Sequence, residues 1–223
     1  MNRIIISDIH IGDKRLDERY LRAFVNYLGY VDELILAGDI LDSWVTNKWD
    51  LDLLYFIVHK SARVIFIKGN HDPENLESII GFKVLESYEF ETPKGKYLVF
   101  HGHQFDYLMA KYSWWAKLSF KLHQFLYSKF NIDLQKIKNL SLARRSKAWY
   151  FKNIINDSIT EIYKKYSKDY KVVICGHTHY PIRVKREDFE YVNSGDLFEN
   201  FTYVKIDKEG NLDLCGFYPP IRS

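Results

Sequence analysis

The chain has 223 residues, of which 47% are hydrophobic and 17% are aromatic, so it can bury one core of ordinary size. This composition excludes a disordered chain. The net charge of +3, from 32 Lys and Arg against 29 Asp and Glu, is weak for a nucleic-acid-binding surface, so we do not expect nucleic acid as the partner.

Three further features bear on location. The two cysteines, Cys175 and Cys215, are too few for a disulfide framework and favour a reducing compartment. The first residues lack the pattern of an export signal. No run approaches the ~20 apolar residues that a spanning helix needs. We expect a cytoplasmic protein whose membrane contacts, if it has any, are peripheral.

Residues 1–103 alternate β-branched runs with amphipathic segments. The runs are RIIIS, LILAG, VIFIKG and YLVF, and apolar residues recur at helical spacing in ERYLRAFVNYLGY and WDLDLLYFIVHK. This alternation predicts βαβ units and an α/β fold.

The strand pattern stops at about residue 104, and helical patterning continues to about residue 168. Residues 104–165 carry 12 Lys and Arg and 4 Asp and Glu, so this segment has a net charge of +8 and the rest of the chain −5. It is also rich in large aromatic residues, including Trp114, Trp115 and Trp149. We predict a basic, aromatic helical lid inserted at about 104–168.

Short strands resume after the insertion. They are expected at residues 171–175, 182–185, 190–192, 201–206 and 212–217, with turn signals at 193–195 and 209–211. We interpret them as the second sheet of a two-sheet sandwich flanked by helices. Residues 1–223 then form a single domain that carries the lid.

Clusters of histidine, aspartate and asparagine follow five of the predicted strands. These clusters are SDIH with Asp8 and His10, GDILD with Asp39, GNHD with Asn70 and His71, FHGH with His101, and CGHTH with His177 and His179. Open α/β sheets place their active sites at the carboxyl ends of strands. The pattern therefore predicts one site with two metal ions.

The ordered clusters resemble the blocks of the calcineurin-like metallophosphoesterase superfamily. The resemblance implies that Asp39 bridges two cations, that Asp8, His10 and His179 complete the first site, and that Asn70, His101 and His177 complete the second. Mixed imidazole and carboxylate ligands suit Mn²⁺, Fe or Zn²⁺ better than Ca²⁺. The superfamily favours manganese.

The resemblance also implies two catalytic residues. His71 is expected to stabilise the transition state or protonate the leaving oxygen, and Asp72 to accept the other ring N–H of His71. Asp42 is expected either to accept a hydrogen bond from a metal-ligating histidine or to cap a helix. His103 is expected near the site or in contact with substrate.

Other polar residues are expected to lie outside the chemistry. We interpret Asp13 as a turn residue, and His59 and His123 as residues of the surface or the core edge.

A closer resemblance is to the UDP-2,3-diacylglucosamine pyrophosphatases of lipid A synthesis. It is carried by VICGHTHYPIRV, VNSGDLFENFTYVKI, HGHQFD and the insertion. It implies conversion of UDP-2,3-diacylglucosamine to UMP and 2,3-diacylglucosamine 1-phosphate. The sequence departs from this branch at His71, where many of its members carry arginine.

Substrate contacts are expected in the lid and in the tail loop. The LARRSK run offers charge-assisted phosphate contacts, and the loop after the CGHTH strand lies beside the metals in the superfamily. The candidate substrate-binding residues are Arg144, Arg145, Ser146, Lys147, His103 and Asn193.

Each of these features has an alternative. The lid aromatic residues line a groove for acyl chains or bury against the body. The basic residues of the lid suit an anionic phospholipid surface, a lipid-linked phosphate or nucleic acid, and the LARRSK run binds phosphate or forms a solvated turn. The rival enzyme is a soluble nucleotide or general phosphodiesterase, followed by a nuclease, and the rival from another class is a non-catalytic scaffold. The sequence leaves the oligomeric state open.

Overall fold

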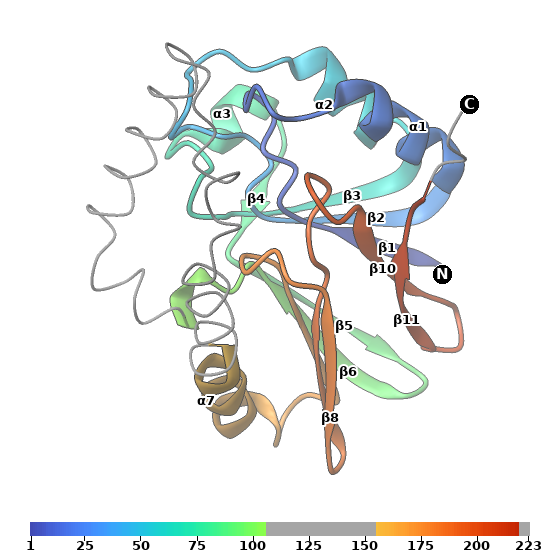
Figure 1. The fold of residues 1–223 in the computed structure, drawn as a ribbon. Helices are drawn as coiled ribbons and strands as arrows, with labels where there is room; N and C mark the ends of the chain where they lie inside the picture. The colour runs from blue at the N-terminus through green and yellow to red at the C-terminus, as the bar shows by residue number, and fades with distance from the viewer. Residues whose placement is uncertain (106–154, 219–223) are drawn as a thin grey trace. The chain divides into compact units, whose positions relative to one another are not determined.

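The computed structural model describes residues 1–105 and 155–218 (Figure 1). The chain divides into two compact units, residues 1–102 with 166–223 and residues 103–165. Most of the predicted lid, with Arg144 to Lys147 and His123, lies outside the described residues. The single-domain organisation stays a prediction.

The first unit contains a six-stranded sheet in which β1, β2, β3 and β4 are parallel and β10 runs antiparallel to β1. The strand order is β11-β10-β1-β2-β3-β4. The strands are β1 (Arg3–Ile6), β2 (Val31–Ala37), β3 (Ser61–Ile67), β4 (Val84–Leu85), β10 (Thr202–Ile206) and β11 (Leu212–Gly216).

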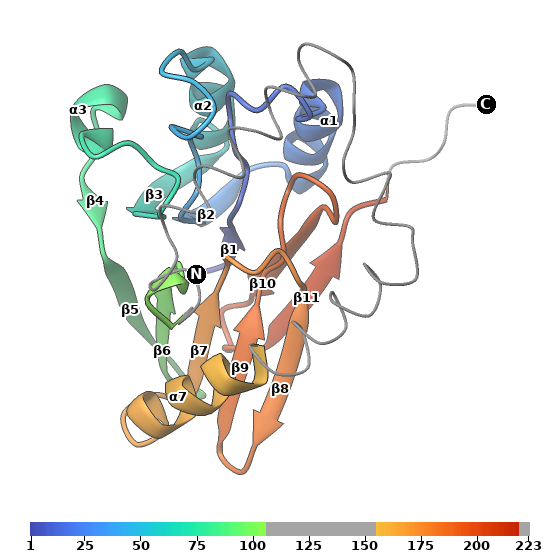
Figure 2. The ribbon, with the colours of Figure 1, turned by 60° about the vertical axis from the view of Figure 1, so that its left-hand side comes forward.

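The second sheet of this unit has five strands in the order β5-β6-β7-β9-β8 (Figure 2). They are β5 (Ser87–Thr92), β6 (Gly95–Phe100), β7 (Val172–Cys175), β8 (Ile182–Arg186) and β9 (Phe189–Asn193). The β6, β7 and β9 strands are parallel, and β5 and β8 are antiparallel edge strands.

The α/β sandwich with two sheets is confirmed, but the division of strands between the sheets was wrong in part. The last two strands pair in the first sheet, where Ile5 lies opposite Val204. The β5–β6 hairpin from the first half of the chain belongs to the second sheet. Periodicity identifies a strand but carries no information on which strand it pairs with, so chain order alone gave the wrong division.

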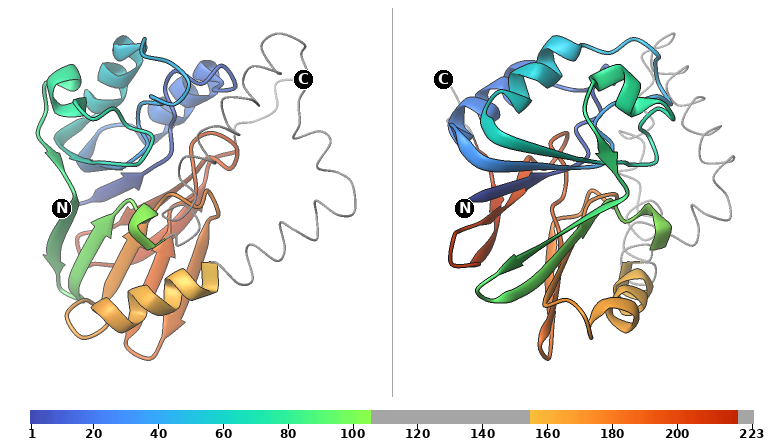
Figure 3. Two further views of the ribbon diagram at one scale, coloured as in Figure 1. Left: turned by 90° about the vertical axis from the view of Figure 1, so that its left-hand side faces the viewer. Right: turned by 180° about the vertical axis from the view of Figure 1, so that it is seen from behind.

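The first sheet is buried on both faces, which explains its nearly continuous apolar strands. Along β1, Ile4 and Ile6 pack into the core beneath the helices, whereas Ile5 packs into the core between the two sheets. The two sheets face each other across this second core (Figure 3).

Three helices cover the outer face of the first sheet: α1 (Glu18–Leu28), α2 (Leu51–Val58) and α3 (Leu76–Ile80). Asp17 and Asp50 accept hydrogen bonds from the first backbone N–H groups of α1 and α2, which fixes where these helices begin. The predicted α1 and α2 segments are thereby confirmed.

The described part of the second unit includes the short turn η1 (His103–Phe105) and all of α7 (Asn156–Tyr166) except its last residue. The Ser158 hydroxyl donates to the Phe105 carbonyl at 2.7 Å. Within residues 1–105 and 155–218, no helix is long and apolar enough to cross a membrane.

Candidate metal centre

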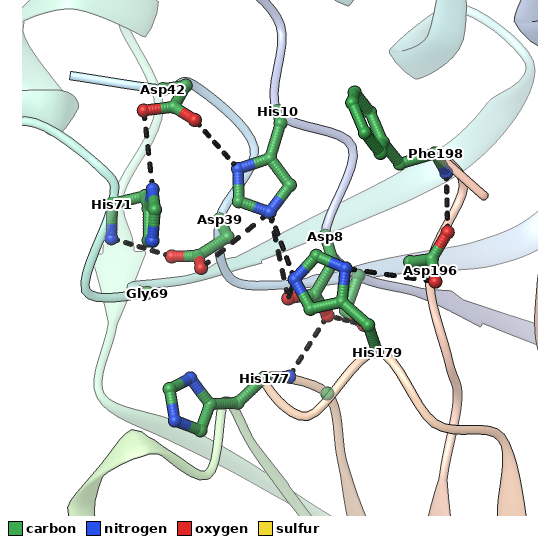
Figure 4. A network of polar contacts seen from close by, with 12 residues as sticks. Asp8, His10, Asp39, Asp42, Gly69, His71, His177, His179, Asp196 and Phe198 are labelled. Atoms are coloured by element: carbon green, nitrogen blue, oxygen red, sulfur yellow. Dashed lines mark hydrogen bonds and ion pairs between the residues drawn. The ribbon is translucent and has the colours of Figure 1, made fainter. Parts of the chain in front are cut away.

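Five parallel strands of the first unit end at one edge of the sandwich, and each is followed by predicted site residues. Asp8 and His10 follow β1, Asp39 follows β2, and Asn70 and His71 follow β3. The second sheet contributes His101 after β6, and His177 and His179 after β7. Figure 4 shows the histidines and carboxylates of this edge converging.

Among the described residues, potential ligand atoms gather in three overlapping triads, and the atoms of each triad lie within 4.8 Å of one another. The triads are Asp8, His10 and His179; His10, Asp39 and His71; and Asp39, His101 and His177. His10 and Asp39 each belong to two of them, and of the two only the Asp39 carboxylate has two oxygen atoms with which to bridge a pair of cations. The first triad matches the predicted first metal site, and the third matches the second site without Asn70.

Two buried oxygen atoms test whether these residues suit cations. Asn70 Oδ1 has no hydrogen-bond partner among the described residues, and neither does Asp8 Oδ1, although it lies 3.3 Å from His179 Nε2. A buried acceptor without a donor costs free energy, unless a cation or water meets it. The donor set of carboxylate, amide and imidazole groups therefore fits two divalent cations. The individual ligand roles stay predictions.

The carboxylates change the protonation of the neighbouring imidazoles. Burial of His101 works to lower its pKa, but Asp39 Oδ2, 3.2 Å from Nε2, outweighs burial and raises the pKa to about 10. Burial of His10 acts the same way, and its hydrogen bond to Asp42 raises the pKa to about 9.

His71 is held by two aspartates from the loop after β2. Its backbone N–H donates to Asp39 Oδ1 at 2.7 Å, and its ring Nδ1 lies 3.3 Å from Asp42 Oδ1. The other oxygen of Asp42 lies 3.0 Å from His10 Nδ1. Burial works to raise the pKa of Asp42, but the hydrogen bonds with His10 and His71 hold it well below its usual value. Asp42 thus adopts the first of its two predicted roles.

The predicted role of Asp72 as the partner of the His71 ring is corrected. Both oxygens of Asp72 accept backbone N–H groups at 2.8 to 2.9 Å, and it is Asp42 that lies beside the ring. The four donors are Asp39, Ile40, Leu41 and Gly69. Burial raises the pKa of Asp72 to about 6, and the nearby Asp39 adds to this rise.

Asn193 is also corrected as a substrate-binding residue. It is fully buried, its amide nitrogen donates to the Gly176 carbonyl, and its amide oxygen accepts the Gly195 N–H at 3.0 Å. Its amide therefore supports the turns around the site.

The remaining predicted residues lie as follows. Asp13 lies in a turn and its carboxylate binds the Arg15 guanidinium, whereas His59 is exposed at the end of α2. His103 belongs to the second unit, and its role stays a prediction, as do the roles of Arg144, Arg145, Ser146 and Lys147, which lie outside the described residues.

Two site residues were missed from the sequence. Asp196 is fully buried, with Oδ2 3.7 Å from His179 Nδ1, and it accepts the N–H groups of Phe198 and Asn200. Trp44 stacks on the His71 ring. The only signal for Asp196 was its place in the tail loop, and Trp44 gave none.

Backbone strain is concentrated in the predicted ligands. Five of them have positive φ, from 54° to 69°, namely Asp8, His10, Asp39, His177 and His179. For residues other than glycine this conformation costs about 1–2 kcal/mol each, and such strain persists where neighbouring contacts over-determine it.

The ligand loops also approach each other closely. A Cβ atom on Gly69 would lie 2.2 Å from the backbone nitrogen of Asp39, and one on Gly176 would lie 2.5 Å from Asp8 Oδ2. Glycine is therefore required where the loops after β1, β2, β3 and β7 meet.

Comparison with known proteins assigns this site to a class. Residues 1–181 match the family model described as calcineurin-like phosphoesterase. The chain belongs to this family and is a metal-dependent phosphoesterase. No curated protein matches it.

Solved structures show the same fold at low sequence identity. A structure described as a novel archaeal phosphodiesterase has a TM-score of 0.51 and 20% identity, with 97% of this chain and all of that chain covered. Vps29 from Chaetomium thermophilum has a TM-score of 0.52 and 12% identity, with 97% of each chain covered. The phosphoesterase YfcE from E. coli has a TM-score of 0.50 and 16% identity, with 93% of this chain and 88% of that chain covered.

Proposed function

We propose that the chain hydrolyses a phosphodiester or pyrophosphate bond in a nucleotide-linked substrate. The observation that supports this proposal is the position of Asp39, which lies within 4.8 Å of ligand atoms of His10 on one side and of His101 and His177 on the other. A carboxylate in that position is suited to bridge two cations, and paired cations support in-line displacement at phosphorus.

When bound, two divalent cations, which we propose to be manganese, supply a nucleophile at neutral pH and neutralise charge on the phosphate oxygens. The protein's own groups orient the substrate and handle the leaving-group proton. Because His71 Nδ1 faces Asp42, the doubly protonated ring would give the proton on its other nitrogen, Nε2, to the leaving oxygen, and the attacking water would return one proton to the site. In the net reaction, water adds to phosphorus, the P–O bond breaks, and the leaving oxygen gains a proton.

The specific substrate that we propose is UDP-2,3-diacylglucosamine, cleaved to UMP and 2,3-diacylglucosamine 1-phosphate. The support is the resemblance of the CGHTH strand, the tail loop and the basic aromatic insertion to the enzymes of that reaction. Arg144 and Arg145, with Ser146 and Lys147, would contact the phosphates. The insertion would contact acyl chains at the inner face of the membrane.

A second candidate is a soluble nucleotide or general phosphodiesterase. His71 favours it, because many members of the lipid-nucleotide branch carry arginine at this position. The similarity in fold to an archaeal phosphodiesterase agrees with this candidate.

A substrate panel with Mn²⁺ tests both candidates. It should include detergent-dispersed UDP-2,3-diacylglucosamine, other nucleotide diphosphates, cyclic nucleotides, an aryl phosphodiester and single-stranded DNA, with the Asp39→Ala variant as the control for contaminating activity. Release of UMP from the acylated substrate alone supports the lipid-nucleotide reaction, and turnover of the unacylated nucleotides supports the second candidate. Absence of metal-dependent turnover on every substrate contradicts both.

A further inference from the structure

Trp44 contacts both the predicted proton donor and a predicted metal-ligand loop. Its indole ring stacks on the His71 imidazole, with centroids 3.8 Å apart and planes at 19°. Its Nε1–H donates to the Asn70 carbonyl at 3.1 Å. One side chain from the loop after β2 thus touches two consecutive residues of the loop after β3.

We infer that Trp44 is a positioning residue that fixes the plane of the His71 ring for proton transfer. This inference rests on the proposed role of His71. Stacked aromatic rings at this separation attract each other beyond the apolar area that they bury. Trp44 therefore favours one ring plane over the others that the side chain can reach.

The torsion that needs fixing is χ2 of His71. This torsion is broad in histidine, so the ring plane is not set by rotamer preference alone. The 3.3 Å contact between Nδ1 and Asp42 Oδ1 restrains one edge of the ring. The ring of His10 meets it at 87° with centroids 4.8 Å apart. Trp44 contacts the face of the His71 ring. The contacts with Asp42, His10 and Trp44 therefore restrain the ring from three directions.

The support for Trp44 is itself built into the loop. The Trp44 backbone N–H donates at 3.0 Å to Asp42 Oδ1, the same oxygen that faces the His71 ring. The backbone N–H and the hydroxyl of Ser43 donate to the His71 carbonyl at 2.9 and 2.6 Å. Residues 42–44 therefore contact both the ring and the backbone of His71, and Trp44 also fixes Asp42, the hydrogen-bond partner of that ring.

The first measurement needs no metal and no substrate. In the metal-free protein, the carbon-bound ring protons of His71 lie over the indole face, so their NMR signals are shifted upfield by the ring current. We expect Trp44→Phe to keep much of this shift and Trp44→Ala to abolish it. His71 signals that do not move in Trp44→Ala would overturn the inference.

The second measurement is a double-mutant cycle on a series of aryl phosphodiesters with Mn²⁺. With a poor leaving group, Trp44→Ala should lower kcat about 10- to 100-fold, a part of the ~10²- to 10⁴-fold that a well-positioned acid supplies. With nitrophenol as leaving group the loss should be much smaller, and Trp44→Phe should lie near wild type. In the His71→Ala background, Trp44→Ala should have no further effect.

Trp49→Phe is the matched control, because Trp49 lies in the same segment, donates to the Asp42 carbonyl at 3.3 Å and packs against the core beneath the helices. It should leave the dependence on leaving group unchanged. Two results would overturn the positioning role of Trp44 and leave the role of His71 standing. They are an equal loss of turnover on all leaving groups in Trp44→Ala, and a turnover of the double variant well below that of His71→Ala. Wild-type turnover in His71→Ala would overturn the proposed role of His71 and this inference with it.

Discussion

His177 offers a direct test of the strained backbone at the metal centre. Its φ is 69°, and its backbone N–H is held by Asp8 Oδ2 at 3.0 Å. The variants His177→Ala and His177→Gly lose the same ring, so their difference in stability reports the backbone alone. We expect the glycine variant to be the more stable of the two.

The magnitude follows from two opposing terms. Alanine in the left-handed region costs about 1–2 kcal/mol, whereas glycine loses about 0.5–1 kcal/mol more conformational free energy on folding. The glycine variant should therefore lead by about 0.5–1 kcal/mol, which is roughly 1–4 °C in Tm for a chain of this size.

His59 provides the matched control, because it is an exposed histidine with φ of −66° at the end of α2. There glycine relieves no strain, and His59→Gly should be less stable than His59→Ala by about 0.5–1 kcal/mol. Urea unfolding of the four metal-free variants gives both differences. The same order of alanine and glycine at the two positions would refute the strain argument.

Four other outcomes are expected. Asp39→Ala should remove metal and lower turnover at least ~10³-fold, because it takes away the carboxylate that two triads share; activity within tenfold of wild type at saturating metal would contradict the bridging role. His71→Ala should lower turnover about 10²- to 10⁴-fold with metal content nearly unchanged, and loss of metal as well would make it a ligand. The pKa values of His10 and His101, about 9 and 10, lie above the unfolded value of about 6.5. The metal-free protein should therefore lose stability as pH rises from about 6.5 to about 10. Metal loading at pH 7.5 should release about two protons, measurable by calorimetry in buffers of different ionisation enthalpy. Changing Arg144 and Arg145 to Glu should raise KM for the acylated nucleotide sugar by a factor equivalent to about 1.5–3 kcal/mol of binding free energy per lost contact. The KM for a small aryl phosphodiester should stay nearly unchanged, and equal effects on both substrates would give the lid a structural role.

The clusters were predictable because each follows a strand whose direction is fixed. Five ligand-bearing strands are parallel in the two sheets, so residues just beyond their carboxyl ends meet at one edge. The β-branched runs mark the strand ends in the sequence. Asp8, Asp39 and His177 could therefore be predicted to lie together without knowledge of the strand order.

The roles of the residues that support the ligands depend on the directions of their side chains, which the sequence does not specify. Asp72 follows His71 directly, yet its carboxylate turns toward backbone N–H groups of the loop after β2, and Asp42, distant in sequence, reaches the His71 ring. Within irregular turns, neighbouring side chains have no fixed period, so adjacency does not predict contact. Asn193 was assigned the wrong role, and Asp196 was missed, for the same reason.

The four hydrogen bonds of Asp72 have a consequence for how cations enter. They tie the backbone at Asp39, Ile40 and Leu41 to that at Gly69 without any ion. The two loops are thus assembled by the polypeptide before loading, unlike small zinc domains that fold only around their metal. We therefore expect the chain to stay folded while its cations are exchanged.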